Sequence, residues 1–188
     1  MRLTFAAHSD PDLAIIWRWF EFQAALIAEE RDHLRRLVPL GLSALSSLRE
    51  HEHQFILQSW SEVDAYLNSQ RAELELLTMF ELLATAEAIL RIDFDRRTTM
   101  KWKDPLSRRF RQIRAERSER VRLDEDILEA LGSEIQPASV VSEFKGALRL
   151  RHWLAHGRHW HPKLGHDYGP NDVFDISQKL IDALPEWA

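Results

Sequence analysis

The chain has 188 residues, of which 45% are hydrophobic and 29% are charged, and it contains no cysteine. A chain of this size buries roughly 70% of its unfolded surface in one core, so stability requires neither a disulfide nor a metal. The lack of cysteine excludes disulfide scaffolds, thiolate metal sites and a cysteine nucleophile, and it favours a reducing compartment. We expect a cytoplasmic protein, because no apolar run approaches the roughly 18 residues of a membrane span and the N-terminus does not resemble a signal peptide.

The composition favours helices. Ala, Leu and Glu greatly outnumber Val, Ile and Thr, and the chain has only six Gly and seven Pro. Residues that favour strands and turns are therefore scarce, which argues against a sandwich, a barrel or an α/β sheet. The predicted fold class is all-α.

Two helices are expected in the N-terminal part of the chain. The first begins at Asp10, a helix N-cap residue followed by Pro, and continues to about Val38. Pro39 and the glycine that follows it interrupt this helix. A second helix is predicted over residues 43–67, with a break or a new cap at residues 68–69.

The strongest helix pattern lies in the middle of the sequence. Residues 70–96 include the segment ELLTMFELLATAEAIL, which has no Gly or Pro and is apolar around most of its circumference. Such a helix is typical of the centre of a bundle. Glu87 and Arg91 lie one turn apart on it, and we expect them to form an ion pair.

Four more helical segments are predicted in the C-terminal part. The first covers residues 106–120, and a short one over residues 123–131 is expected to end at Gly132. A longer helix runs from about residue 137 to 156, with the following glycine in the left-handed conformation that caps helix C-termini. The last helix is expected to be capped by Asn171.

Basic residues are concentrated between Arg96 and Arg122. This segment has eleven Lys and Arg residues against three acidic ones, a net charge of +8, whereas the whole chain has a charge of −5. A basic segment on an acidic protein indicates a polyanionic partner, either nucleic acid or an acidic protein. The alternative is a solvated arginine-rich helix stabilised by ion pairs one turn apart.

The candidate chemistry lies in the segment SEFKGALRLRHWLAHGRHWH. Arg151 falls on the apolar face of the predicted helix, which is costly for a charged group unless it is paired or faces a cleft. Arg149, His152 and His156 lie close to it on the same end of the helix. Guanidinium groups bind phosphate and stabilise its transition state, while imidazole moves protons near neutral pH. These groups suffice to cleave RNA through its 2′-hydroxyl.

The motif Arg151-x-x-x-x-His156, with polar His152 directly after the arginine, resembles the signature of the HEPN superfamily (higher eukaryotes and prokaryotes nucleotide-binding domains). The resemblance covers about residues 52–187. It implies a bundle of four or five helices that forms a homodimer with a composite cleft. Many members are metal-independent endoribonucleases of toxin–antitoxin or phage-defence systems, and others bind RNA or nucleotide without cleaving it. Arg151 and His156 would be the catalytic pair, with His152 beside them.

The predicted organisation is an N-terminal helical extension, residues 1–50, and a HEPN-like domain, residues 51–188, with a basic insertion at 96–122. The expected function is a metal-independent endoribonuclease, and the alternative is a non-catalytic HEPN module that binds RNA, nucleotide or a partner protein such as an antitoxin or effector. No cofactor or metal is expected. The predicted RNA-binding residues are Arg96, Arg97, Lys101, Lys103, Arg108, Arg109, Arg111, Arg114, Arg149 and Arg158.

Three other interpretations stay open at this point. Arg151 could pair with an internal carboxylate such as Glu81 or Glu87, and His156 could simply cap its helix. His152 and His156 have zinc-ligand spacing, but no cysteine and no glutamate of a metalloprotease pattern accompanies them. The chain could also be a structural all-α protein whose motif only resembles that of the family.

Overall fold

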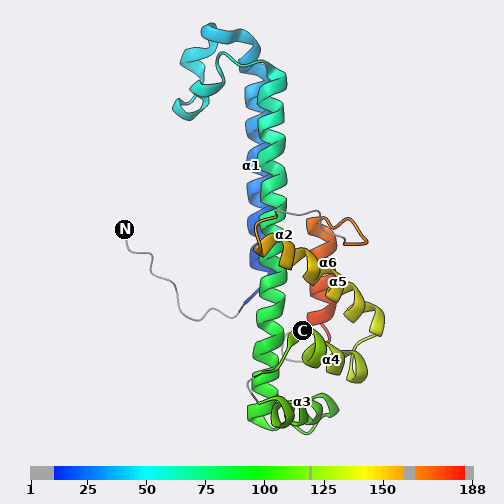
Figure 1. The fold of residues 1–188 in the computed structure, drawn as a ribbon. Helices are drawn as coiled ribbons and strands as arrows, with labels where there is room; N and C mark the ends of the chain where they lie inside the picture. The colour runs from blue at the N-terminus through cyan, green and yellow to red at the C-terminus, as the bar shows by residue number, and fades with distance from the viewer. Residues whose placement is uncertain (1–10, 119, 159–163, 185–188) are drawn as a thin grey trace. The chain divides into compact units, whose positions relative to one another are not determined.

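The computed structural model describes residues 11–118, 120–158 and 164–184, and all regular secondary structure in these ranges is helical (Figure 1). The prediction of an all-α chain is therefore confirmed. None of the described helices combines the length and the apolar composition that a membrane crossing requires.

The chain forms two compact units. The N-terminal unit is Trp17–Thr78, and the C-terminal unit is Met79–Ala188 together with the chain before Trp17. The division falls inside the longest helix, α2 (Trp60–Met100). The sequence places a domain boundary after residue 50 instead, and a separate domain beginning there stays a prediction.

The N-terminal unit is a helical hairpin. Helix α1 (Leu13–Leu37) runs antiparallel to the first part of α2, as the contacts of Arg31 with Asp64 and of Arg71 with the Phe20 ring show. Asp12, rather than Asp10, begins α1, since its carboxylate accepts a hydrogen bond from Ala14 N at 2.8 Å; Asp10 lies outside the described residues. The core at the closed end of the hairpin consists of Leu34, Val38, Leu48, Phe55, Val63 and Leu67.

The predicted helix over residues 43–67 is wrong. Two short 3-10 helices, η1 (Val38–Ser47) and η2 (Glu50–Phe55), occupy its first part, and only its end, from Trp60 onward, is α-helical. Gly41 has a φ of +54°, which an ordinary helix does not allow, so the chain turns there. Helix α2 then begins after Ser59, whose backbone N donates to Glu62 at 2.7 Å. This capping box was the overlooked signal for the helix start.

The predicted break at residues 68–69 is also absent, because α2 continues through it. The side chains of these residues form hydrogen bonds along the helix, and the Asn68 side-chain oxygen also accepts from Arg31 of α1. Asn68 donates to Asp64 at 3.1 Å, and the Ser69 hydroxyl donates to the Tyr66 carbonyl at 2.7 Å. Asn and Ser disfavour helices when they compete for backbone groups, but here they bond back along α2 without interrupting it.

The C-terminal unit packs five shorter elements with the second part of α2 (Figure 1). They are α3 (Pro105–Arg117), the π-helical turn η3 (Leu123–Ile127), α4 (Leu128–Glu134), α5 (Ala138–Ala155) and α6 (Pro170–Ile181). Contacts join α3 to α4, α4 to α5 and α5 to α6. The apolar face of α2 supplies several of the most buried side chains, among them Leu82, Leu83, Ala86, Ile89, Leu90 and Phe94.

Two predicted helix ends differ from those observed. Gly132 lies inside α4, against Val141 of α5, and does not end the helix. Helix α6 begins after Gly169, whose backbone N donates to the Asp172 carboxylate at 2.8 Å, so Asn171 is already helical. The prediction for the end of α5 is confirmed, because Gly157 has a φ of +80° directly after it.

Candidate functional site

Helix α5 positions the residues of the predicted motif. Its buried face consists of Val141, Phe144, Ala147 and Leu150, which recur every three or four residues. Packing of this face against the rest of the C-terminal unit sets the rotation of the helix. The motif side chains in the last two turns consequently lie at the edges of the buried face and beyond it.

Arg151 lies at the edge of the core and is paired. Its side chain is 34% exposed, and its terminal nitrogen lies 3.0 Å from the Glu87 carboxylate of α2. The alternative in which an internal carboxylate holds this arginine is therefore present in the structure, with Glu87 as the partner. The Arg151 Nε atom is buried and has no hydrogen-bond partner among the described residues. This buried nitrogen could donate a hydrogen bond to a bound anion.

Glu87 forms ion pairs with two arginines, Arg91 and Arg151. Its other carboxylate oxygen accepts a hydrogen bond from the Arg91 Nε atom at 2.9 Å, so the predicted ion pair along α2 is confirmed. One carboxylate faces two guanidinium groups, and the trio therefore has an excess positive charge. Such a partly neutralised pair of arginines can still attract a phosphate.

The rings of the two motif histidines are in contact at the end of α5. The ring centroids of His152 and His156 are 4.2 Å apart, with the ring planes tilted by 55°. Both residues are exposed. The His156 backbone N donates to the His152 carbonyl at 3.1 Å, which places His156 at the C-cap of the helix. The structure thus brings the two imidazoles together, as their spacing predicts.

A pocket of about 760 Å³ opens beside this end of α5. Arg149, Arg151 and His152 line it together with Glu87 and Arg91, whereas His156 is outside the lining and its ring contacts that of His152. Residues from the turn before α4 and from α4 and α5 complete the walls, including Arg122, Asp124, Glu125, Glu129 and Lys145. The sequence did not single out this second set, because the set comes together only through the packing of α2, η3, α4 and α5.

Most cations of the pocket are paired, and Arg149 is the exception. Arg122 donates to both Glu125 oxygens, at 2.6 and 2.7 Å, and Lys145 pairs with Glu129. Arg149 forms no hydrogen bond or ion pair with the part of the chain that the structure describes. Its guanidinium is exposed at the pocket, so its five N–H donors can meet a ligand.

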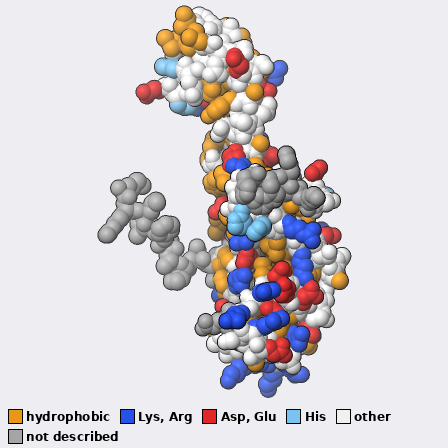
Figure 2. Space-filling view, viewed as in Figure 1, with side chains coloured by type: hydrophobic (Ala, Val, Ile, Leu, Met, Phe, Trp, Pro, Cys, Tyr) orange, Lys and Arg blue, Asp and Glu red, His pale blue; other side chains and the backbone are white. Residues whose placement is uncertain are grey.

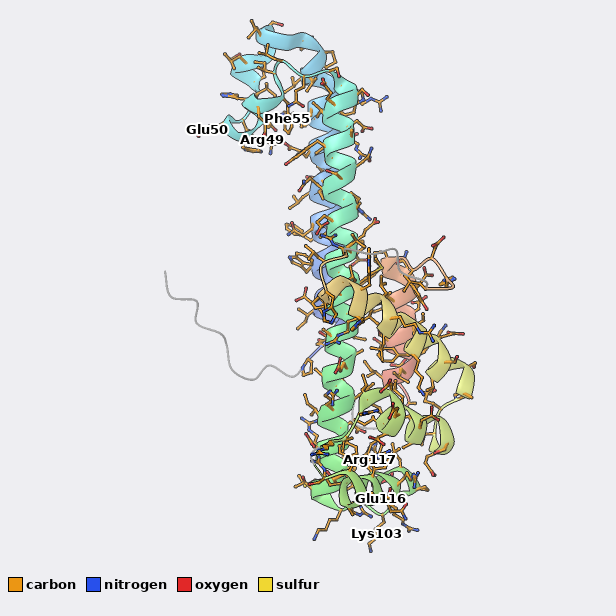
Figure 3. All side chains as sticks on the ribbon, in the orientation of Figure 1. Arg49, Glu50, Phe55, Lys103, Glu116 and Arg117 are labelled. Carbon is orange, nitrogen blue, oxygen red and sulfur yellow. The ribbon has the colours of Figure 1, made fainter. Side chains whose placement is uncertain are left out.

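Part of the basic segment forms an exposed cationic surface. Lys101, Lys103, Arg108 and Arg109 are exposed at the end of α2 and on α3, and none of them pairs with an acidic residue among the described residues. Figure 2 shows Lys and Arg side chains gathered at this end of the C-terminal unit, and Figure 3 shows Lys103 extending away from the ribbon. We call these four residues the α3 surface. They are exposed members of the predicted RNA-binding set that have no acidic partner in the described chain, as is also true of Arg149.

Arg97 is not part of that surface. It is 3% exposed, and it donates to Asp93 at 2.7 Å and to Asp104 at 3.1 Å. Its guanidinium also lies 5.1 Å from the Trp102 ring. The prediction that Arg97 binds RNA is therefore wrong, because this residue fixes the turn between α2 and α3.

The remaining predicted RNA-binding residues are partly occupied. Arg111 donates to the Trp102 carbonyl at 2.8 Å, and Arg114 pairs with Asp95 and lies over the Phe94 ring. Arg96 is half-buried, and Arg158 is exposed with a φ of +56° after the end of α5.

Comparison of the chain with models of known protein families, with characterised proteins and with solved structures finds no match. The residues of this chain and their geometry are therefore the basis for its proposed function.

Proposed function

We propose that the chain is a metal-independent endoribonuclease of the HEPN type that cleaves RNA through its 2′-hydroxyl. The main support for the proposal is that two guanidinium groups and an imidazole, those of Arg149, Arg151 and His152, line one pocket. The His156 ring lies next to His152, with 4.2 Å between the ring centroids. Paired guanidinium donors and a general acid–base group are the requirements of phosphodiester cleavage. The pocket is large enough for a nucleotide.

Each residue of the site has its own role in the proposed cleavage reaction. Arg149, which has no acidic partner among the described residues, binds the scissile phosphate, and Arg151 stabilises the charge that develops on it. One of the two histidines accepts the proton of the 2′-hydroxyl while the 2′-oxygen bonds to phosphorus. The other gives a proton to the 5′-oxygen as the bond from phosphorus to that oxygen breaks. The products are a 2′,3′-cyclic phosphate and a 5′-hydroxyl.

The α3 surface would hold the RNA backbone. Lys101, Lys103, Arg108 and Arg109 offer four exposed charges without acidic partners in the described chain, and such charges bind phosphate regardless of base sequence. We propose in addition that two copies of the chain associate, as the HEPN resemblance implies, so that each contributes a motif to the cleft.

A cleavage assay tests the activity. We expect cleavage of single-stranded RNA to persist in EDTA and to stop when the scissile nucleotide carries 2′-deoxyribose. His156→Ala should lower the rate about 100-fold, the usual share of a positioned acid–base group. Arg151→Ala should have a similar effect and leave the protein folded, because Glu87 keeps Arg91 as its partner.

His166→Ala is the matched control. His166 precedes α6 and packs edge-on against the Tyr168 ring, 5.0 Å away, and it does not line the pocket. This variant should cleave RNA at the parent rate. Parent-like activity of His156→Ala, or dependence of the parent on added metal, would refute the assignment.

A non-catalytic RNA- or nucleotide-binding module is the second candidate. It is favoured by the ion pair that neutralises part of Arg151 and by the position of His156 outside the pocket lining. The same assay separates the two functions. A binding module would retain the RNA, and Arg149→Ala would weaken that binding, but no variant or parent would produce a cyclic phosphate.

A further inference from the structure

A second cluster of ionisable side chains lies in the N-terminal unit, far along the sequence from the motif. Helix α1 supplies Glu30 and His33, which are one turn apart, and η2 supplies His51 and Glu52. Packing of η2 on the closed end of the hairpin brings the two pairs together. The proposed RNA chemistry makes no use of these residues.

Three of the four donor groups are close enough to share one ion, and His33 adjoins them through Glu52. The ligand atoms of Glu30, His51 and Glu52 all lie within 4.8 Å of one another. Nε2 of His51 is 3.7 Å from Glu30 Oε1, and Nε2 of His33 is 3.4 Å from Glu52 Oε2. Two ligands of a tetrahedral zinc ion, each about 2.0 Å from the metal, are separated by about 3.3 Å. The observed separations therefore need only small side-chain adjustments.

His33 supplies an independent sign of a missing ligand. Its Nε2 atom is buried and has no hydrogen-bond partner among the described residues, although Glu52 lies 3.4 Å away. Buried polar atoms are normally satisfied by protein, water or an ion. A cation bound between His33 and Glu52 would accept the lone pair of this nitrogen.

The negative charge of the two carboxylates also favours the binding of a divalent ion. Glu52 is fully buried and Glu30 is 20% exposed, so two carboxylates sit together with little solvent around them. The cation beside them is Arg49, which donates from Nε to Glu52 at 2.6 Å and pairs with Glu30 as well. One guanidinium balances only one of the two charges. The Arg49 side chain is 55% exposed, so it can withdraw into solvent when another cation arrives (Figure 3).

We infer that Glu30, His33, His51 and Glu52 form a binding site for a divalent transition-metal ion of the zinc class, in which Arg49 occupies the cation position while no metal is bound. Two imidazoles and two carboxylates suit zinc and its neighbours, whereas magnesium and calcium prefer oxygen ligands alone. The ion would tie η2 to α1 and stabilise the closed end of the hairpin. The expectation of no metal was based on the spacing of His152 and His156 alone and did not consider these four residues.

Zinc titration of the full-length protein tests the site. Zinc chloride is added to the parent and to His33→Ala and His51→Ala, and binding is followed by calorimetry. Loss of a partner outside the coordination sphere already costs 10–100-fold in affinity, so loss of a ligand should lower zinc affinity about tenfold or more. His51 is exposed, so its variant stays folded even if that of His33 does not. Magnesium chloride should produce no binding.

Arg49→Met distinguishes a metal site from a simple ion-pair network. Removal of the competing cation should raise zinc affinity, and zinc should raise the melting temperature of this variant more than that of the parent. His152→Ala/His156→Ala is the control, because that pair could bind zinc adventitiously; it should retain the high-affinity zinc. The inference is overturned if both His33 and His51 variants bind zinc as the parent does, if the control variant loses all zinc, or if zinc does not stabilise Arg49→Met.

Discussion

Asp104 connects the two helices of the basic segment through three hydrogen bonds. Its carboxylate accepts from Ser107 N at 2.9 Å, from the Ser107 hydroxyl at 2.5 Å and from Arg97 at 3.1 Å. Burial opposes ionisation, but the bonds from Ser107 and the charge of Arg97 outweigh it and lower the pKa of Asp104. The ionised carboxylate thus acts both as the N-cap of α3 and as a counterion of the buried Arg97.

This lowered pKa predicts the pH dependence of stability. A group whose pKa is lower in the folded state contributes stability above its unfolded pKa, about 3.9, and loses it as the pH falls through the folded value. The stability advantage of the parent over Asp104→Asn should therefore be complete at pH 6 and shrink below about pH 4. Asp104→Ala should lower the free energy of unfolding by about 1 kcal/mol more than Asp104→Asn does, because asparagine can still cap the helix. Urea unfolding between pH 3 and pH 7 measures both effects. If the free energies of unfolding of the parent and Asp104→Asn differ by the same amount at every pH in this range, the pKa of Asp104 is not lowered in the folded state.

Gly146 in α5 allows a close approach of a side chain. A Cβ atom at this position would lie 2.6 Å from the Tyr168 hydroxyl, closer than van der Waals contact allows. Gly146→Ala should therefore destabilise the parent although alanine favours helices by about 1 kcal/mol over glycine. In the Tyr168→Phe background, which lacks the hydroxyl, the same change should stabilise the protein. Thermal unfolding of the four proteins measures this coupling, and equal effects in both backgrounds would exclude the close contact.

At the scale of the element, the end of α2 and α3 together separate structural arginines from exposed basic residues. Arg97 and Arg114 are held by aspartates, whereas Lys103, Arg108 and Arg109 have no acidic partner in the described chain. Replacing these last three by Gln should lower RNA affinity and flatten the slope of log affinity against log salt by about 2, since each phosphate contact with single-stranded nucleic acid contributes about 0.7. Fluorescence anisotropy at several salt concentrations measures the slope.

Arg114→Gln is the control for that measurement. It removes one positive charge from the same helix, but a charge that is already paired with Asp95. Its salt slope should stay close to that of the parent. If the triple variant also keeps the parent slope, the α3 surface does not bind the RNA backbone and the +8 charge of the segment serves another partner.

At the scale of the whole molecule, the proposed dimer is open to a direct test. Helix α1 exposes Trp19, Phe22 and Leu26, which are 41%, 61% and 43% exposed and follow the three- and four-residue spacing of a coiled-coil seam. We expect sedimentation at micromolar concentration to give twice the chain mass of 22.1 kDa. Phe22→Glu should shift the protein to monomer without unfolding it, because the side chain is exposed. A parent that sediments only as a monomer would contradict the composite cleft.

Much of the architecture follows from local pattern. The all-α class, the long apolar helix around residues 70–96 and the left-handed Gly157 are correct because they depend on composition, helical periodicity and the freedom of glycine at positive φ. The errors occur where local signals compete. The Ser59–Glu62 capping box begins α2 later than predicted, and the expected break at residues 68–69 is absent because the side chains there form hydrogen bonds along the helix.

The sequence by itself also determined which chemistry was available: guanidinium and imidazole groups within the last turns of α5, and no thiol anywhere in the chain. Only the tertiary structure decided which of those groups are free. Burial and ion pairing removed Arg97 from the RNA-binding set, paired Arg151 with Glu87 and left Arg149 without an acidic partner among the described residues. The physical reason is that the state of a charge depends on its neighbours in space. Some of those neighbours lie far away in the sequence, as Glu87 of α2 does from Arg151 of α5, and no local pattern records them.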